Sequence, residues 1–422
     1  MNTNVAIIGG GAAGCFAAVC LRRMCPQADV TVYESGRRPL AKVAVTGGGR
    51  CNLTNSFAEV RSLAAVYPRG ERLMKRLLRE FGNDDVCRWF EAEGVRLVTQ
   101  DDCCVFPKSQ DAMEIVGTLT RLMRQTGVHL KTGHRLTKIE PMEAEGGTGY
   151  RLTFADETLE AVRADTVIVA TGGSPKPSGL DMLRPLGVET VAPVPSLFSV
   201  CLKENDIRQL AGTVVEDVSA WIAGTKLRAQ GALLITHWGM SGPAVLRLSS
   251  YGARWLNEHD YRAGLHVNWL GDTGAADAEQ LIDSLAADND RKQLASAYPR
   301  TLNARLWAHL LAHSGLNPEL RWRELGRKGK QRLIETLINS SYTIDGKCRH
   351  KEEFVTCGGV DLGSLNPRTL ECRTAPDVYF VGEVTDVDGV TGGFNLQAAW
   401  TMGYIAARSA AQRIDERQNK QT

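Results

Sequence analysis

Three glycines and one acid near the start of the chain have the spacing of a dinucleotide-binding turn. Gly9, Gly11 and Gly14 follow an apolar run that begins at Val5, and Glu34 ends the next apolar run, 20 residues after Gly14. In such a turn, the first glycine permits a sharp bend, the second lets a pyrophosphate approach the backbone, and the third lets a helix press against the strand. The start of that helix offers free N–H groups and the positive end of its dipole to the phosphates.

The acid at the end of the second run indicates which dinucleotide binds. A carboxylate there accepts a hydrogen bond from a ribose hydroxyl, whereas it would repel a 2′-phosphate. Glu34 therefore favours FAD or NAD over NADP. We expect Ala12 and Ala13, which open the helix, to lie against the same ligand. The uncharged stretch from Val5 to Leu21 could also be a signal peptide or membrane helix, but it is short, rich in glycine and not preceded by Lys or Arg.

Further elements of the fold that positions this turn are expected far along the chain. Residues 165–169 end in the apolar sequence Val-Ile-Val, typical of a buried strand in a parallel sheet, and lead into the small turn 170–173. A further strand is expected at 378–383 and a helix at 395–413. Between the turn 170–173 and the strand expected at 378–383, five prolines from Pro175 to Pro195 mark a connector. It leads to short strands within 197–269 and to a helical pattern over 277–338. The nucleotide-binding fold is therefore expected to be discontinuous.

Bulk properties exclude several classes of protein. The net charge is +2, so any basic site must be local, and no apolar run suggests a membrane span. The eleven cysteines include no Cys-x-x-Cys pair. We therefore expect a reduced, cytoplasmic protein with no membrane association, no disulfide framework and no zinc or other metal site.

Several separated motifs together resemble one family. Besides the turn and Glu34, they are the segments TGGGRCNLTN at 46–55, ATGG at 170–173, THWGMSGPA at 236–244, GGV at 358–360 and GEVTDVDGVTGGFNLQ at 382–397. These are similar to the YhiN/BaiN-like flavoproteins, also called the aminoacetone-oxidase-like family. The resemblance covers nearly the whole chain. One departure is a shortened loop after Gly173, where the family carries a further Gly-Asp-Gly motif.

The resemblance implies an α/β fold. It consists of a discontinuous, glutathione-reductase-type FAD-binding Rossmann domain with an inserted β-rich domain and a small helical subdomain. We expect the FAD domain at 1–194 and 357–422, the β-rich insert at 195–275 with a return strand at 341–356, and the helical subdomain at 276–340. The implied activity is that of an FAD-dependent oxidoreductase.

The resemblance also assigns residues to the cofactor. Beyond those in the first turn, the residues expected to bind FAD are Lys42, Gly49, Arg50, Cys51, Asn52, Leu136, Thr171, Gly172, Gly382, Glu383, Gly393, Phe394, Asn395 and Leu396. N–H groups at the start of the last helix would stabilise negative charge on reduced flavin. Asp386 and Asp388 are interpreted as solvated loop or capping residues.

Two residues are candidates for proton transfer. Cys51 is the only cysteine inside a motif, and it is either a proton donor beside the flavin or a small packing residue. His237 either lines the substrate cleft or belongs to a rigid junction. In the same motif, Ser241 is expected to cap a helix that Pro243 starts.

The substrate is left with several alternatives. Relatives in this family reduce carbon–carbon double bonds with NAD(P)H, either uridine in large-subunit ribosomal RNA or a steroid enone. A basic segment around Trp322, with Arg321, Arg327 and Lys328 and followed by Arg349 and Lys351, favours RNA as partner, with the indole as a stacking residue. A small-molecule enone, an amine oxidised by oxygen, and a non-catalytic RNA-binding or redox-sensing flavoprotein are the alternatives. No second dinucleotide fingerprint appears, so NAD(P)H is expected to bind transiently as reductant.

Overall fold

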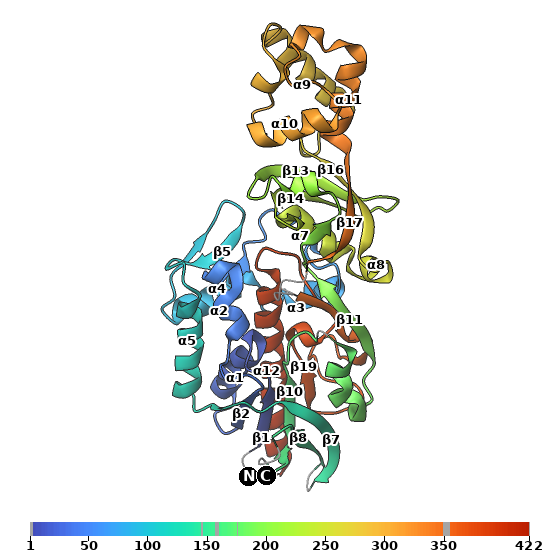
Figure 1. Cartoon of the computed structure of the whole chain (residues 1–422). Coiled ribbons are helices and arrows are strands. Elements are labelled where there is room, and N and C mark those ends of the chain that lie inside the picture. Colours follow the sequence, from blue (N-terminus) through green and yellow to red (C-terminus); the bar gives the residue numbers. More distant parts are fainter. Residues whose placement is uncertain (1–2, 145–146, 157–159, 175, 349–354, 422) are drawn as a thin grey trace. The chain divides into compact units, whose positions relative to one another are not determined.

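The computed structural model describes residues 3–144, 147–156, 160–174, 176–348 and 355–421 (Figure 1). The chain divides into two compact units, each described below by itself. The first unit comprises Met1–Val194 and Val355–Thr422, and the second comprises Pro195–Phe354. Arg349 and Lys351 lie outside the described residues.

A five-stranded parallel sheet forms the centre of the first unit. Its strands follow the order β19-β10-β1-β2-β6, with bounds Val378–Phe380, Thr166–Val169, Asn4–Ile8, Asp29–Glu34 and His129–Thr132. The central strand β1 pairs in parallel with β10 and β2. Its residues Val5–Ile8 are all buried, because both faces of the sheet are covered. This arrangement confirms the α/β Rossmann fold class.

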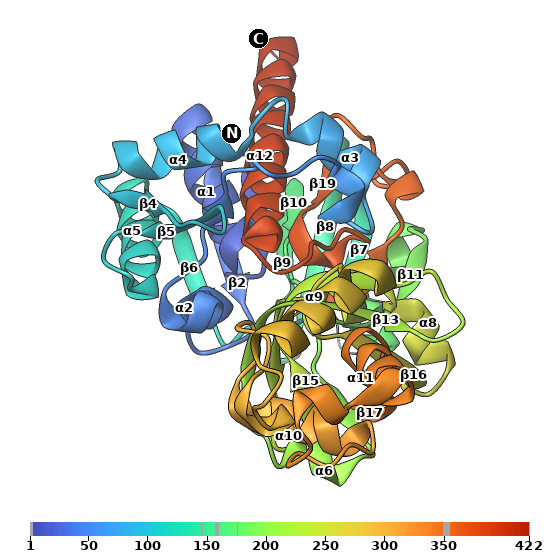
Figure 2. The same ribbon diagram turned by 90° about the horizontal axis from the view of Figure 1, so that it is seen from above.

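Helices α1 (Ala12–Met24) and α12 (Phe394–Gln421) lie side by side against this sheet (Figure 2). A side chain on Gly403 of α12 would come within 2.8 Å of the Ala13 carbonyl oxygen, so glycine permits the close approach of the two helices. Their contact joins the first and last segments of the unit. The glycine turn before α1 and the glycine segment before α12 therefore belong to one compact body.

Further elements surround this centre. The helices are α2 (Ala41–Gly49), α3 (Glu71–Leu77), α4 (Asn83–Ala92) and α5 (Ala112–Gln125), with short 3-10 helices η1 (Leu63–Ala65), η2 (Pro177–Leu186), η5 (Leu362–Ser364) and η6 (Gly382–Val384). The outer strands are β3 (Thr54–Asn55), β4 (Leu97–Thr99), β5 (Cys104–Pro107), β7 (Leu136–Ala144), β8 (Gly147–Phe154), β9 (Val162–Ala164), β11 (Thr190–Ser196) and β18 (Val355–Val360).

The second unit contains a closed six-stranded barrel. Its order is β12-β15-β14-β13-β16-β17, with bounds Val200–Leu202, Gly239–Ser241, Arg228–Ile235, Val214–Ile222, Arg262–Asn268 and Ser340–Lys347. The helices are α6 (Asn205–Arg208), α7 (Pro243–Tyr251), α8 (Ala253–Glu258), α9 (Ala275–Asp288), α10 (Ala304–His313) and α11 (Gly326–Asn339), with η3 (Leu294–Ser296) and η4 (Trp322–Glu324). One hydrophobic cluster runs through barrel and helices, and it includes Trp269 and Trp307.

Across the described ranges, no helix combines the length and the apolar character needed to cross a membrane.

Candidate cofactor site

In the first glycine turn, two glycines are closely packed and one faces open space. Gly9 has φ +108°, and a side chain there would lie 2.3 Å from the Ala170 carbonyl oxygen. A side chain on Gly14 would lie 2.0 Å from the Gly9 carbonyl oxygen. At Gly11 an added Cβ would meet no atom within 4 Å, and the φ of −83° would also permit a side chain. Gly11 therefore faces open space where a pyrophosphate could approach, and the turn fits a dinucleotide.

The carboxylate of Glu34 is fixed beside this turn. Its Oε2 accepts from the Gly10 N–H at 2.7 Å, and its Oε1 accepts from the Gly36 N–H at 2.6 Å and from the Ser35 hydroxyl at 3.2 Å. A carboxylate offers about four acceptor positions, so capacity remains for a ribose hydroxyl. Glu34 ends β2, which pairs with β1, and this places it at the same sheet edge as Gly11.

Glu383 organises the turn that follows strand β10. Its Oε1 accepts from the Thr356 N–H at 2.9 Å and from the Thr356 hydroxyl at 3.2 Å, and its Oε2 lies 3.1 Å from Lys42 Nζ. A side chain on Gly173 would collide with both Glu383 and Thr356. These contacts explain the glycine at 173, whereas Gly172 is favoured by its φ of +75°. Thr356 was not identified from the sequence, because its role depends on partners distant in the chain.

The segment from Lys42 to Asn55 begins as a helix. Residues from Ala41 are helical in α2, and the helix breaks where Thr46 turns extended and Gly47 and Gly48 take positive φ. Arg50 donates from Nε to the Gly47 carbonyl oxygen at 3.0 Å, and its guanidinium carbon lies 4.4 Å from the centre of the Phe106 ring. These contacts show that Arg50 organises this loop, and its contact with FAD stays a prediction.

Cys51 lies in the interior of the first unit. It is 0% exposed, and its N–H donates to the Thr46 carbonyl oxygen at 2.9 Å. Burial raises the pKa of the Cys51 thiol to about 12, against a smaller opposing effect of the Thr46 hydroxyl. This burial favours the packing alternative for Cys51, and its roles in proton transfer and FAD binding stay predictions.

The glycine segment before α12 is tied to the loop after α2. The Asn52 amide lies between the Thr54 carbonyl oxygen, at 2.9 Å, and the Gly393 N–H, at 3.2 Å, and it satisfies both when its oxygen faces Gly393. Asn395 donates to the Gly389 carbonyl oxygen at 2.7 Å and accepts from the Gly389 N–H at 2.8 Å. These bonds hold the two motifs together, as expected of segments that bind one ligand.

Side chains that the sequence did not single out complete this region. The Tyr67 hydroxyl donates to the Phe394 carbonyl oxygen at 2.9 Å. Arg69 pairs with Asp388, which is fully buried, so the interpretation of Asp388 as a solvated residue was wrong. Asp386 instead accepts from the Gly358 N–H at 3.0 Å. Both acids hold the loop before α12, and their sequence context gave no sign of this.

Leu136 and Leu396 stay predictions as cofactor contacts. Leu136 opens β7, is 7% exposed, and belongs to the same hydrophobic cluster as Tyr33, the neighbour of Glu34. Leu396 lies in the first turn of α12, where N–H groups have no partner within the helix. Both positions are in the first unit, as their assignment to FAD requires.

His237 lies at the tip of a tight hairpin in the second unit. Thr236 and Gly239 exchange backbone hydrogen bonds of 2.8 and 3.3 Å, which leaves His237 and Trp238 as a two-residue turn between β14 and β15. The His237 side chain is exposed. It is thus available to a ligand, and its proton-transfer role stays a prediction.

The remainder of this motif partly differs from expectation. Pro243 does start helix α7, but the residue at the cap is Gly242, with φ +90°. Ser241 instead forms a 2.6 Å hydrogen bond with the Ser199 hydroxyl. The serine therefore joins β15 to the residue that precedes β12 and does not cap the helix.

The basic segment of the second unit lacks the expected stacking residue. Trp322 is only 2% exposed, because its ring packs 6.4 Å from that of Trp307 in the core. Lys330 is paired with Glu279 and Asp283 at 2.7 and 3.0 Å. The cations left exposed on α11, and without an ion pair in the described part of the chain, are Arg327, Lys328 and Arg332.

Comparison with known families now decides the affiliation of the chain. Residues 3–409 match the family described as HI0933-like protein Rossmann domain. The chain belongs to this family. The fold class and the assignment as an FAD-dependent oxidoreductase are thereby confirmed.

Two curated relatives cover nearly the whole length. The chain is 30% identical to the 3-dehydro-bile acid delta(4,6)-reductase of Clostridium scindens, over 97% of this chain and 99% of the relative. It is 29% identical to the ribosomal RNA dihydrouridine synthase of Escherichia coli, over 95% and 96%. Among solved structures, a 3-ketosteroid-delta4-(5alpha)-dehydrogenase from Rhodococcus jostii matches with a TM-score of 0.50 and 14% identity, over 97% of each chain. This last likeness shows the fold alone.

Proposed function

We propose that this protein reduces a carbon–carbon double bond conjugated to a carbonyl group. The observation that carries the proposal is that two relatives, equally similar over nearly their whole length, bear the names of a bile-acid reductase and a dihydrouridine synthase. The delta-4 and delta-6 double bonds of a 3-dehydro steroid are conjugated with its 3-carbonyl group, and the C5–C6 bond of uracil is likewise conjugated with a carbonyl group. One catalytic arrangement can therefore serve both classes of substrate.

Different residues of the first unit are assigned to different parts of the cofactor. Glu34 accepts from the ribose, and Gly11 with the start of α1 receives the pyrophosphate. FAD, when bound, supplies the hydride. We assign the flavin end to the segment held by Asn52 and Asn395, where the first N–H groups of α12 stabilise negative charge.

Proton delivery is assigned to His237. Reduction of a conjugated double bond adds a hydride to one carbon and a proton to the next, so an acid must face the substrate. Cys51 is enclosed by protein, whereas the imidazole of His237 is exposed at a hairpin tip. Replacement with Asn should lower turnover while FAD content stays unchanged.

The reductant is proposed to be NAD(P)H. The chain has one dinucleotide fingerprint, from Gly9 to Gly14, which FAD occupies in this proposal. NAD(P)H would therefore bind transiently beside the flavin rather than in a domain of its own. Anaerobic bleaching of the flavin by NADH or NADPH tests this step.

Uridine in large-subunit ribosomal RNA is our proposed substrate. The support is the exposed face of α11, where Arg327, Lys328 and Arg332 are available to phosphates. Trp322 is buried, so it gives no support for stacking on an RNA base. A cytoplasmic location accompanies the proposal. The bile-acid reductase relative makes a small-molecule enone the second candidate.

The deciding experiment is to measure dihydrouridine in ribosomal RNA by mass spectrometry in cells with and without the gene. Loss of one dihydrouridine, restored by the intact protein, supports the RNA substrate. Unchanged dihydrouridine removes that substrate and moves the proposal to enones, tested by anaerobic turnover with NADH and NADPH. Charge reversal at Arg327 and Lys328 should weaken RNA binding and flatten its dependence on salt, with Arg124→Glu at an exposed position of the first unit as control.

A further inference from the structure

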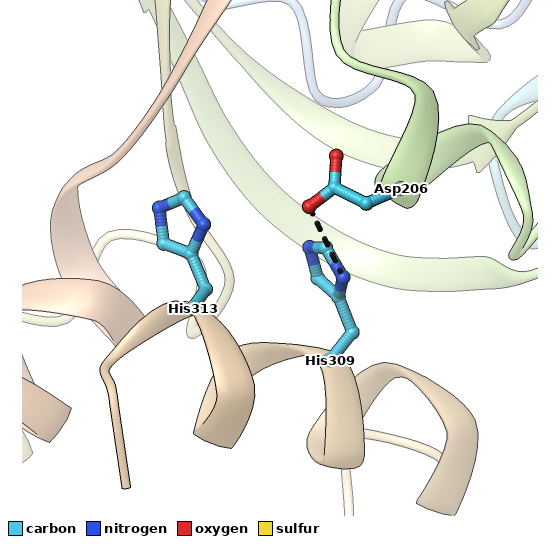
Figure 3. A group of neighbouring side chains, drawn as sticks. All are labelled: Asp206, His309 and His313. Carbon is cyan, nitrogen blue, oxygen red and sulfur yellow. Dashed lines mark ion pairs between the residues drawn. The ribbon is translucent and has the colours of Figure 1, made fainter.

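Two histidines and one acid of the second unit, to which no role has been assigned, lie together. His309 and His313 are four residues apart on α10, so both project from one face of the helix, and Asp206 approaches them from α6 (Figure 3). One ligand atom from each of the three residues lies within 4.8 Å of the others. Asp206 lies far from both histidines in the sequence, so their spacing gives no sign of this group.

The hydrogen bonding of His309 is incomplete. Its side chain is only 10% exposed, and its Nε2 is buried without a hydrogen-bond partner among the described residues. Its Nδ1 lies 3.8 Å from Asp206 Oδ2, which is beyond hydrogen-bonding distance. Buried ring nitrogens are normally satisfied, so an unpartnered one that faces two other potential ligands calls for an explanation.

We propose that Asp206, His309 and His313 bind a divalent transition-metal ion of the zinc class. Imidazole and carboxylate are ligands that such ions accept, and three protein ligands leave one position for water. Bonds of about 2.0–2.2 Å would draw the three ligand atoms closer than they lie now. Asp206 and His313 are exposed and can turn toward the ion, whereas His309 is already enclosed.

An aromatic residue borders the group. Tyr342 stacks on His313, with 6.2 Å between the two ring centres.

A bound ion would fasten α6 to α10 inside the second unit. At present the two segments are joined by one described hydrogen bond, from Arg305 Nη2 to the Gln209 carbonyl oxygen at 2.9 Å. A metal bound by Asp206 and the two histidines would add a second connection. Because the metal binds the folded arrangement and not the unfolded chain, it would also stabilise the fold.

The test is calorimetric titration of untagged, chelator-treated full-length protein with Zn²⁺, with Mg²⁺ as a parallel titrant. We expect one Zn²⁺ site, no Mg²⁺ binding, and a higher melting temperature with Zn²⁺. His313→Ala, at an exposed position, should weaken Zn²⁺ binding at least tenfold and abolish the thermal shift. His129→Ala is the matched control, because His129 lies 3.6 Å from Asp29 without a second histidine. Absence of Zn²⁺ binding by the intact protein, or equal binding by His313→Ala, overturns the proposal.

Discussion

Arg69 and Asp388, separated by 319 residues in the chain, form a two-point ion pair inside the first unit. The Asp388 side chain is 0% exposed and that of Arg69 is 10% exposed. The pair joins the segment before α3 to the loop before α12, where the flavin end is assigned. Its integrity therefore affects the shape of the cofactor site.

Removal of one partner should destabilise the protein strongly. For Asp388→Ala we expect a loss of about 3–5 kcal/mol in the free energy of unfolding, because the largely buried Arg69 charge loses a two-point ion pair. Asp388→Asn should cost less, since its oxygen can still accept. Urea unfolding of each variant measures the effect. Arg408→Ala, which breaks a surface pair with Glu80, is the control and should cost about 1 kcal/mol or less.

Glu34→Gln should release FAD without unfolding the protein. The amide keeps the size of the side chain but loses the charge that strengthens a hydrogen bond to the ribose, a change of about 1.5–3 kcal/mol, or roughly tenfold to a hundredfold in affinity. Flavin fluorescence after gel filtration measures the retained FAD. Asp29→Asn, at the opposite end of β2, is the control. Equal FAD retention in both variants would contradict the role of Glu34.

The parts of this site that could be predicted are those whose signal is local. The spacing of Gly9, Gly11 and Gly14 predicts a turn, and Glu34 follows at the end of the next strand. Neighbouring residues specify such features, because the same short segment forms the structure and contacts the ligand.

The parts that escaped prediction depend on distant partners. Asp388 resembles a loop residue until Arg69 is placed beside it, and Trp322 resembles a surface aromatic until its packing on Trp307 is seen. Cys51 looked reactive from its motif, whereas its burial is set by the surrounding fold. Composition and spacing carry no information on such long-range contacts.

The glycines of the first turn should separate into two kinds when replaced by alanine. Gly14→Ala should destabilise the fold itself, since its Cβ would lie 2.0 Å from the Gly9 carbonyl oxygen. Gly11→Ala should fold normally, because its Cβ meets nothing within 4 Å, but should lose FAD. Thermal unfolding of the apoprotein and FAD content of the holoprotein measure the two effects. Normal FAD content in Gly11→Ala would contradict the assignment of the open space to the pyrophosphate.

Cys51→Ala should retain FAD and turnover within about twofold of the intact protein, because the thiol fills interior space and reaches no ligand. The raised pKa of Cys51 keeps the thiol neutral up to high pH. It contributes stability that is fully present below the unfolded thiol pKa of 9.0 and is lost as pH rises toward about 12. Turnover with the identified substrate, and urea unfolding between pH 8 and pH 11, measure both effects. A turnover loss of a hundredfold with FAD retained would restore Cys51 as the proton donor, in place of His237.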